Sequence, residues 1–592
     1  MTQTAFLGIE RSCGGKRWRP RLENERTALA ISQKLGLPEI LGRVLAARGV
    51  GVDEAEAFLD PKLRDLLPDP SHLVDMDRAV GRIVAAINAG ERIGVFGDYD
   101  VDGAASTSLL AKFFAAIGRE VDVYIPDRIK EGYGPNAAAL RKLKEGGVSL
   151  VITVDCGTTA FGPLKEAADA GLDVIVVDHH VAEPRLPQAV AVVNPNRLDE
   201  TSPVGQLCAA GVTFLLIVAV NRALREAFWY GEGHAEPDLR RLLDLVALAT
   251  VADVVPLTGV NRALVRQGLS VMAQRGNPGL AALCDVARLD EKPEAWHLGF
   301  MLGPRVNAGG RVGEAGLGVR LLTSDSRDEA AGIATRLDRY NEERREIEAG
   351  VLEAAMRQAE RQAESDVPLI LAAGEGWHPG VIGIVAGRIK EAFNRPACVV
   401  SLDGGLGKGS GRSVRGVALG PAVIAAHQAG LLVNGGGHAM AAGFTVAEDR
   451  LPEFRDFLAE HIAAQLGGSA LAPDIGIDGV LTPEGATVEL IDLLDAAGPY
   501  GAGNPRPRFV LPGVVPVRAD VVGSDHVRCF LAMPEGGPRL KSIAFPAVGT
   551  EVGDALLGAR GGVLNVAGHL NIDTWQGRRA PQFVIEDVAR PV

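Results

Sequence analysis

The sequence predicts an α/β protein with more than one sheet domain, and three observations support this prediction. Short, β-branched apolar segments alternate with helical stretches from about residue 78, which is typical of a doubly wound parallel sheet. Residues 326–366 contain no proline and keep an apolar stripe among dense Arg and Glu, which indicates one long helix. After residue 472, short strands with glycine turns predict a small β-barrel.

The first sheet domain follows a short, proline-punctuated segment, residues 1–75, that we expect to be helical. Its strands are predicted at five nearly all-apolar segments, a composition typical of strands buried on both faces: 92–96, 121–125, 150–154, 174–177 and 190–193. Helices are expected near 104–117, 136–146, 161–170, 205–225 and 239–252. A second, glycine-rich α/β domain is predicted over residues 367–466.

Composition narrows the class of protein. The 592 residues carry 61 basic and 74 acidic side chains, a net charge of −13, with 47% apolar residues. This is a globular mixture, which excludes disorder as the main state, and the acidic balance disfavours general DNA coating without excluding a locally basic groove. The longest largely apolar run, 207–220, is too short for a bilayer, so no membrane association is expected. Six scattered cysteines without a CxxC pair favour a reducing cytoplasm.

Four clusters of acidic residues or histidine lie at the ends of predicted strands. They are GDYDVDG (97–103), VDCG (154–157), DHH (178–180) and TVADVVPL (250–257). The carboxyl ends of parallel strands lie at one edge of a sheet, so the first three clusters should converge. Carboxylates packed this closely repel one another and need a cation. Oxygen ligands with imidazole suit manganese, magnesium or zinc, most naturally as a pair of divalent ions.

Each cluster also has a simpler interpretation. Asp98, Asp100 and Asp102 match the start of a calcium loop, but that loop needs a glutamate at its twelfth position, where this chain has Leu109, and a helix before it. Asp155 alone would be a turn or helix cap, and His179–His180 alone is a weak signal. Their joint occurrence at successive strand ends favours a metal site. Neither Gly-Lys pair is followed by Ser or Thr, which disfavours a P-loop ATPase.

These motifs carry a resemblance to a known family. GDYDVDG, VDCG, DHH and Asp253 resemble the four motifs of the DHH phosphoesterase superfamily. GVIGIVAGR (380–388), GSGRS (409–413) and GGGHAMAAG (435–443) resemble its DHH-associated domain, and PYGAGNPRPRF (499–509) resembles the start of the C-terminal domain in bacterial RecJ single-strand-specific exonucleases. Small-molecule members of the superfamily have a histidine where this chain has Phe96, so the pattern favours the RecJ branch.

The resemblance implies the following domains: an N-terminal helical lead-in (1–75), a DHH catalytic domain with a parallel sheet (76–325), a long connecting helix (326–366), a smaller α/β DHH-associated domain (367–466) and an OB-fold-like, nucleic-acid-binding β-barrel (470–592). The barrel carries basic and aromatic residues of the kind that bind single strands, although aromatic residues in a barrel are more often core. They are Arg506, Arg508, Arg518, Arg528, Arg539, Lys541, Phe509, Phe530, Phe545 and Trp575.

The resemblance also implies roles for individual residues. The divalent ions, Mn²⁺ or Mg²⁺, would be held by Asp98, Asp100, Asp102, Asp155, His179 and Asp253. His180 would complete the catalytic set by binding the scissile phosphate, and Asp178 would orient the two histidines. Nucleic-acid or phosphate contacts would come from Arg128, Tyr133, Arg305, Asn307, Ser410, Arg412, Gly436, Gly437 and His438. The segments around Arg305 and Arg412 could instead be solvated surface loops.

The function implied is a metal-dependent 5′-to-3′ exonuclease on single-stranded DNA, acting in recombination and in mismatch and gap repair. Arg128, Ser410 and Arg412 are the candidates for holding a terminal 5′-phosphate. Single-stranded DNA is the expected partner, with a helicase and a single-strand binding protein, for a monomeric cytoplasmic enzyme. The alternatives are an oligonucleotide or cyclic-dinucleotide phosphodiesterase and a catalytically silent replication scaffold.

Overall fold

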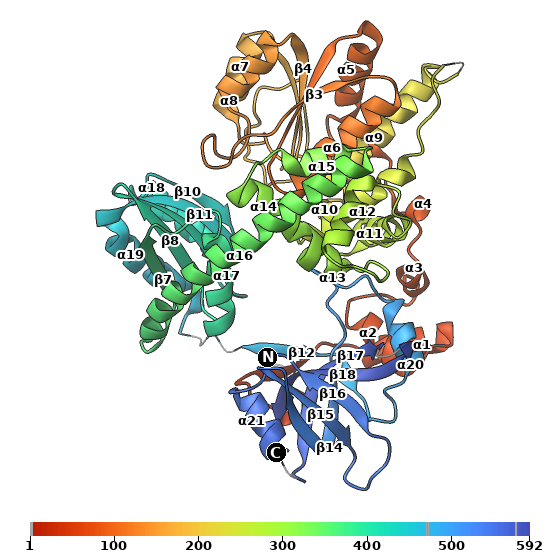
Figure 1. The fold of residues 1–592 in the computed structure, drawn as a ribbon, viewed down its shortest axis with the longest axis vertical. Coiled ribbons are helices and arrows are strands. Elements are labelled where there is room, and N and C mark those ends of the chain that lie inside the picture. Colours follow the sequence, from red (N-terminus) through yellow and green to blue (C-terminus); the bar gives the residue numbers. More distant parts are fainter. Residues whose placement is uncertain are drawn as a thin grey trace. The chain divides into compact units, whose positions relative to one another are not determined.

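The computed structural model describes residues 4–231, 233–468, 471, 473–559, 561–574 and 577–591. The chain forms two compact units. The first contains residues 1–310, 314–338 and 474–592, and the second contains residues 311–313 and 339–473. Figure 1 colours the ribbon along the sequence.

The first unit starts with short elements, several of which pack against the C-terminal part of the chain. They are η1 (Phe6–Gly8), β1 (Arg17–Pro20), α1 (Glu25–Leu35), α2 (Glu39–Ala46), α3 (Ala55–Leu59), α4 (Leu63–Leu66) and η2 (Pro70–His72). β1 pairs in parallel with β12 (Asp474–Ile477). The indole Nε1–H of the fully buried Trp18 donates to Asp587 Oδ2 at 2.7 Å. The predicted helical lead-in is thus mainly helical, with one strand that joins it to residues almost 460 positions away.

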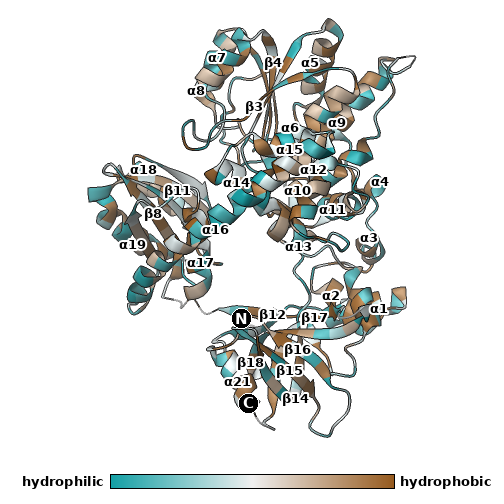
Figure 2. Cartoon of the chain, viewed as in Figure 1, coloured by the Kyte–Doolittle hydropathy of each residue, from teal (hydrophilic) through white to brown (hydrophobic). Residues whose placement is uncertain are grey.

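The parallel sheet predicted from the apolar segments is confirmed. Its strands run in the order β3-β2-β4-β5-β6, and all neighbours are parallel. The elements are α5 (Met76–Ala89), β2 (Arg92–Gly97), α6 (Val101–Ala116), β3 (Val121–Tyr124), α7 (Ala137–Glu145), β4 (Val148–Val154), α8 (Phe161–Asp169), β5 (Asp173–Val177) and β6 (Ala191–Val193). The inner strands β2, β4 and β5 are almost entirely buried, as expected for strands covered on both faces, and Figure 2 colours the chain by hydropathy.

Helices complete this domain and lead into the second unit. They are α9 (Ala209–Glu226), η3 (Leu239–Leu242), α10 (Leu243–Ala252), α11 (Gly259–Met272), α12 (Pro278–Val286), α13 (Ala295–His297), the π-helical η4 (Leu298–Leu302), α14 (Gly303–Val312), α15 (Leu317–Thr323) and α16 (Arg327–Ala363). The long helix predicted over 326–366 is confirmed as α16. Residues 303–311, for which a solvated loop was an alternative, form most of α14.

The second unit is built on a mixed sheet. Its elements after α16 are β7 (Ile370–Glu375), α17 (Ile382–Phe393), β8 (Ala397–Asp403), β9 (Leu406–Arg412), α18 (Leu419–Gln428), β10 (Asn434–His438), β11 (Ala441–Ala447), η5 (Glu448–Arg450) and α19 (Leu451–Leu466). The strand order is β10-β11-β9-β8-β7, and only β7 and β8 are parallel. Val351 and Ala355 of α16 pack with α17 on one face, whereas Phe454 and Leu458 of α19 pack with α18 on the other.

The glycine-rich segments of this unit correct one expectation. From their glycines we expected the backbone amides of 404–416 to approach a phosphate, with a flexible surface loop as the alternative there and a tight turn as the alternative for 435–443, but both segments contain β-strands, β9 and β10. β9 pairs on both sides, with β8 and β11, so ladder hydrogen bonds occupy its backbone amides. Binding by β9 must therefore use side chains rather than amides.

The C-terminal strands close into the predicted β-barrel. Its elements are β13 (Gly479–Val480), α20 (Val488–Asp495), β14 (Phe509–Val522), β15 (His526–Ala532), β16 (Leu540–Ala544), α21 (Glu551–Gly558), β17 (Leu564–Asp573) and β18 (Ala580–Ala589). The order β14-β15-β16-β18-β17 is closed by pairing of β14 with β17. The barrel core also includes Ile31, Leu41 and Leu45 from α1 and α2. Within the described ranges, no helix is both long and apolar enough to span a membrane.

Candidate active site

The first acidic cluster lies where β2 ends and α6 begins. Asp100 caps α6, because its Oδ1 accepts hydrogen bonds from the amides of Asp102 (3.0 Å) and Gly103 (3.1 Å). A Cβ at position 103 would lie 2.6 Å from the backbone of Asp98, so only glycine allows the helix to start this close to the strand. Asp98 is buried, and its Oδ1 has no hydrogen-bond partner among the described residues. A buried carboxylate oxygen without a protein partner fits a cation ligand.

The second strand end carries Asp155, directly after β4. Its backbone has φ +62°, a left-handed conformation that is uncommon outside glycine, and its side chain is buried. The amide of Asp155 donates to Val177 O on β5 at 3.0 Å, and the Tyr133 hydroxyl donates to Asp155 O at 2.9 Å. These contacts hold a strained residue in place, which is a recurrent property of functional sites.

The third strand end is organised by Asp178, which follows β5. Its Oδ1 accepts from the amide of His179 at 2.8 Å and lies 2.8 Å from His180 Nδ1, and its Oδ2 accepts from the amide of Thr158 at 3.1 Å. Burial alone would lower the pKa of His180, but the hydrogen bond to Asp178 and the negative charges of the neighbouring aspartates together outweigh burial and raise that pKa to about 9. His180 is therefore protonated at neutral pH.

Asp102 is fixed by a different element, the N-terminus of α9. Its two carboxylate oxygens accept from the amides of Ala209 (2.7 Å) and Ala210 (2.8 Å). The partial positive charge of a helix N-terminus favours a carboxylate at this place. Asp102 therefore faces the site with a fixed orientation.

These groups converge on the imidazole of His179. Its Nε2 lies 3.4 Å from Asp155 Oδ1, 3.7 Å from Asp253 Oδ2 and 3.8 Å from Asp102 Oδ2. Asp253 comes from the C-terminal end of α10, so the fourth cluster follows a helix and the expectation that it lies at a strand end is wrong. Three groups have ligand atoms within 4.8 Å of one another: Asp98–Asp100–Asp155, Asp102–His179–Asp253 and Asp155–His179–His180. The structure thus brings all six predicted metal-binding residues into one site.

The electrostatics of this cluster fit a divalent cation. Burial raises the pKa of Asp98 and Asp155, and repulsion between the neighbouring carboxylates raises them further. Burial and the charges of Asp102 and Asp100 raise the pKa of Asp253 to about 9. Burial also lowers the pKa of His179, which keeps the imidazole neutral, as a metal ligand must be. So many carboxylates can ionise together only beside a compensating positive charge.

In the second unit, the predicted phosphate-binding residues lie on β9 and β10, the two strands that flank β11. Register places His438, Ala441 and Arg412 in one row across β10, β11 and β9, and Gly436, Gly443 and Ser410 in the next row of the same face. Arg412 Nη1 donates to Ser410 Oγ at 3.1 Å. A Cβ at Gly383 of α17 would lie 3.0 Å from both side chains, so the start of α17 borders this face. Gly437 has a structural role instead of lying in these rows. Its φ of +149° and its closeness to Ala441 allow only glycine at this position.

Comparison with known proteins places these features in a family. Three family models match: the DHH family N-terminal domain over residues 92–250, the DHHA1 domain over 366–464 and the RecJ OB domain over 477–587. The single-stranded-DNA-specific exonuclease RecJ of Dickeya dadantii is 39% identical over 566 residues, which cover 93% of this chain and 96% of the relative. The chain belongs to the RecJ family.

Other RecJ proteins are similar over most of this chain. RecJ of Escherichia coli is 38% identical, with 93% of this chain and 96% of the relative covered, and RecJ of Bacillus subtilis is 34% identical, with 97% and 71% covered. The crystal structure of RecJ from Thermus thermophilus in complex with Mn²⁺ has a TM-score of 0.80 at 30% identity, covering 97% of this chain and 80% of that one. Its Mg²⁺ complex has a TM-score of 0.75 at 29% identity, with coverages of 97% and 78%.

Two asparagines that the sequence analysis missed lie beside the RecJ histidines. Asn194 Nδ2 donates to His180 O at 2.8 Å and to Thr158 Oγ1 at 2.9 Å, and Asn196 Nδ2 donates to His179 O. Both follow β6, the next strand of the sheet. Applying the strand-end rule to the apolar segment 190–193 would have found them.

The remaining predicted residues of the catalytic domain have internal contacts. The guanidinium of Arg128 lies 5.1 Å from the ring centre of Tyr99, and Tyr133 is half exposed beside His180. Arg305 Nε pairs with Asp338 at 2.8 Å. Asn307 Oδ1 accepts from the amide of Val101 at 3.1 Å, so it supports the backbone between Asp100 and Asp102. Their contacts with nucleic acid remain a prediction.

The barrel residues divide into core and surface. Phe509 is fully buried, so it belongs to the core and cannot stack on a base, whereas Phe545 is half exposed and meets His526 edge to face. Arg508 pairs with Glu586 at 2.6 Å. Trp575 lies outside the described residues. Exposed Phe545 is thus the better candidate for stacking.

Proposed function

We propose that this chain is a metal-dependent exonuclease that hydrolyses the phosphodiester bonds of single-stranded DNA from the 5′ end. The observation that supports it most is the gathering of five carboxylates and His179 into one cluster, with three of the carboxylates within 3.8 Å of His179 Nε2. The curated relatives carry the name single-stranded-DNA-specific exonuclease, and Thermus RecJ has been solved with Mn²⁺ and with Mg²⁺. We therefore assign Mn²⁺ or Mg²⁺ as the cofactor.

In this proposal Asp98, Asp100, Asp102, Asp155, His179 and Asp253 hold the divalent ions. Such ions, when bound, acidify water and offset negative charge on a phosphoryl group. The protein's contribution is orientation. Asp102 is held by an amide at the start of α9, and Asp155 is held by its backbone hydrogen bond to β5. The amide of His179 donates to the Asp178 carboxylate.

His180 supplies a positive charge beside the ions. Its Nδ1 is engaged by Asp178 at 2.8 Å, so its Nε2–H is the donor we assign to the scissile phosphate. A charge-assisted hydrogen bond of this kind is stronger than a neutral one. Asp178 both orients this imidazole and keeps it protonated.

We assign the preference for starting at the 5′ end of the strand to residues of the second unit. Arg412 and Ser410 form a side-chain pair on β9, bordered by the start of α17. A guanidinium can hold a terminal phosphate by two parallel hydrogen bonds. Arg128 of the first unit remains a further candidate for the same role.

We also propose a cellular role in recombination and in mismatch and gap repair, for a monomeric enzyme that works with a helicase and a single-strand binding protein. The cytoplasm is the proposed compartment. All six cysteines are free thiols, which suits a reducing environment.

The test uses the full chain with three substrates: a long 5′-phosphorylated single strand, the matching duplex and a dinucleotide. Each is incubated with Mn²⁺, with Mg²⁺ or with a chelator. We expect mononucleotides from the single strand alone, released first from the 5′ end, and no products in the chelator. Equal turnover of the dinucleotide would favour the phosphodiesterase alternative, and inactivity on every substrate with metal would favour the scaffold alternative.

A further inference from the structure

The segment that follows Asp253 has an unusual backbone. α10 ends at Ala252, and Val254, two residues later, has φ +61° with its side chain 69% exposed. A β-branched residue in the left-handed region is an outlier, and such conformations persist only where the surroundings impose them. The position of the Asp253 carboxylate therefore depends on what holds residues 254–257.

A loop at the start of the C-terminal domain contacts this segment. The amide of Leu257 donates to Ala502 O at 2.7 Å. A Cβ at Gly501 would lie 2.8 Å from Leu257 Cδ1, and a Cβ at Gly503 would lie 2.8 Å from Pro256 Cβ. The two glycines thus let the loop pack directly against Pro256 and Leu257, the third and fourth residues after Asp253. We call residues 497–505 the bracing loop.

The bracing loop is itself rigid. Gly501 and Asn504 form an isolated β-bridge, with hydrogen bonds of 2.9 and 3.2 Å. The side-chain amide of Asn504, which is 1% exposed, donates to Ala497 O and Pro499 O, both at 2.9 Å. A closed and internally bonded loop can impose a conformation on its neighbour.

Arginines from two other parts of the first unit anchor the bracing loop. Arg48, from the end of the N-terminal helices, donates to Asn504 Oδ1 at 2.7 Å and to Pro505 O at 2.6 Å. The buried Arg262 of α11 donates to Ala497 O at 2.9 Å and to Phe58 O at 2.7 Å. The loop is therefore tied both to the N-terminal segment and to the helix that follows the Asp253 segment.

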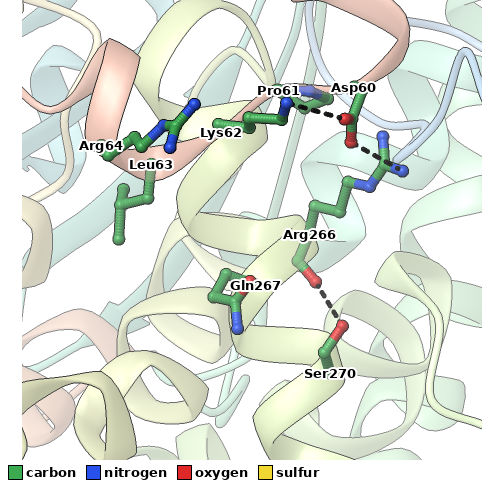
Figure 3. Close-up of a pocket in the computed structure, with 8 residues that line it drawn as sticks. All are labelled: Asp60, Pro61, Lys62, Leu63, Arg64, Arg266, Gln267 and Ser270. Atoms are coloured by element: carbon green, nitrogen blue, oxygen red, sulfur yellow. Dashed lines mark hydrogen bonds and ion pairs between the residues drawn. The ribbon is translucent and has the colours of Figure 1, made fainter.

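One turn further along α11, a second arginine strengthens the same junction. Arg266 lies 3.6 Å from Asp60, whose other carboxylate oxygen lies 3.7 Å from Lys62. Figure 3 shows these side chains around a pocket of about 400 Å³, with Asp60 between the two cations. The N-terminal segment is thus attached to α11 beside the loop's anchor.

We propose that the bracing loop is a positioning element for Asp253 and so couples the C-terminal domain to the metal centre. This inference rests on the proposed function, in which Asp253 is a metal ligand. Its contacts with the segment after Asp253 are made to Leu257 and Pro256, so it acts on the metal ligand through these two residues. Residues that orient metal ligands from outside typically change metal affinity by about 10–100-fold when they are replaced.

The test compares two glycines of the same backbone class. Gly503 has φ +69° and contacts Pro256, whereas Gly513 of β14 has φ +65° and only Val563 nearby, 3.9 Å from a built Cβ. Gly503→Ala and Gly513→Ala thus carry the same backbone strain, but only the first pushes on the Asp253 segment. Mn²⁺ affinity is measured by electron paramagnetic resonance of the free ion, with thermal melts and with kcat and KM on a short and a long single strand.

We expect Gly503→Ala to weaken Mn²⁺ binding by about tenfold and to lower kcat on both strands equally, without raising KM for the long strand. Gly513→Ala should lower Tm by a similar amount and keep the wild-type Mn²⁺ affinity. If Gly503→Ala fails to fold, Gly501→Ala replaces it, because its Cβ meets only the end of the Leu257 side chain.

Unchanged Mn²⁺ affinity in the folded bracing-loop variant would overturn the inference and leave the loop as a structural connector. A rise in KM for the long strand alone would also overturn it, since the loop would then act on DNA binding. The proposed function fails separately, if the wild-type chain binds Mn²⁺ but cleaves no single strand. In that case the Mn²⁺ titration still decides the role of the loop.

Discussion

The two five-stranded sheets of this protein present their candidate functional residues in different ways. In the parallel sheet, Asp98, Asp155 and Asp178 all follow the last residue of a strand. In the mixed sheet of the second unit, Ser410 and Arg412 lie within a strand and project from its face. The first arrangement gathers acidic groups at an edge, and the second displays small and basic residues over a surface.

The difference follows from strand direction. Parallel neighbours bring all their carboxyl ends to one edge, so residues distant in sequence meet there regardless of register. Antiparallel neighbours place residues opposite one another only through register, which aligns Ser410 with Gly443 and Gly436. The residues of an edge site can therefore be predicted from their positions directly after strands. The residues of a face site cannot, because they meet only through the pairing of strands, which the sequence does not specify.

The edge site should give the largest effect. Asp155→Asn should reduce cleavage by about 10³-fold or more, because removing a ligand forfeits several kcal/mol of charge stabilisation, while asparagine still tolerates the left-handed backbone. Cleavage rates and thermal melts of the purified variant measure this.

Asp173→Asn is the matched control, since Asp173 begins β5 at the opposite edge of the same sheet and pairs with Arg82. Near-wild-type cleavage by Asp155→Asn, or an equal loss in Asp173→Asn, would contradict the assignment of chemistry to one edge.

The face site should give a smaller and more selective effect. Arg412→Ala should lower the preference for 5′-phosphate over 5′-hydroxyl ends by about tenfold or more, since a hydrogen bond to a charged group contributes about 1.5–3 kcal/mol. Competition between the two substrates measures it. Lys408→Ala removes the same charge four residues earlier on β9 and should keep the preference. If Arg412→Ala keeps the full preference for 5′-phosphate ends, the assignment of Arg412 to the phosphate pocket is wrong.

Substitutions at two glycines of the second sheet distinguish its proposed binding face from its packed face. They should give the smallest effect on activity. Gly443 has no atom within 4 Å of a built Cβ, so Gly443→Val should leave Tm unchanged and raise KM by about two- to tenfold, the worth of one lost hydrogen bond. At Gly409 a Cβ would meet the Phe444 ring at 2.1 Å, so Gly409→Ala should cost about 1–3 kcal/mol of stability. Melts and steady-state kinetics of both variants provide the comparison, and a KM change at neither position would argue against nucleic acid on this face.

The N-terminal segment changes how the barrel can be tested. From the sequence alone, a chain cut near residue 470 should keep its chemistry and lose its grip on long strands. In the structure Ile31, Leu41 and Leu45 share the barrel core, and Trp18 bonds to Asp587. Such a cut would expose these apolar side chains and delete the bracing loop, so point variants such as those above are the cleaner test.

The sequence by itself determined the parallel sheet, the long helix and the acidic edge of the sheet. The spacing of apolar residues and the position of acidic residues directly after a strand are local properties, so both can be recognised in short stretches of sequence. It also indicated the barrel and the family motifs. Only the tertiary structure decided that residues 404–416 and 435–443 contribute strands, that Asn194 supports the histidines, and that residues 497–505 contact the segment after Asp253. These depend on pairing and contact between segments up to hundreds of residues apart, and such contacts are set by packing of the whole chain rather than by any local pattern.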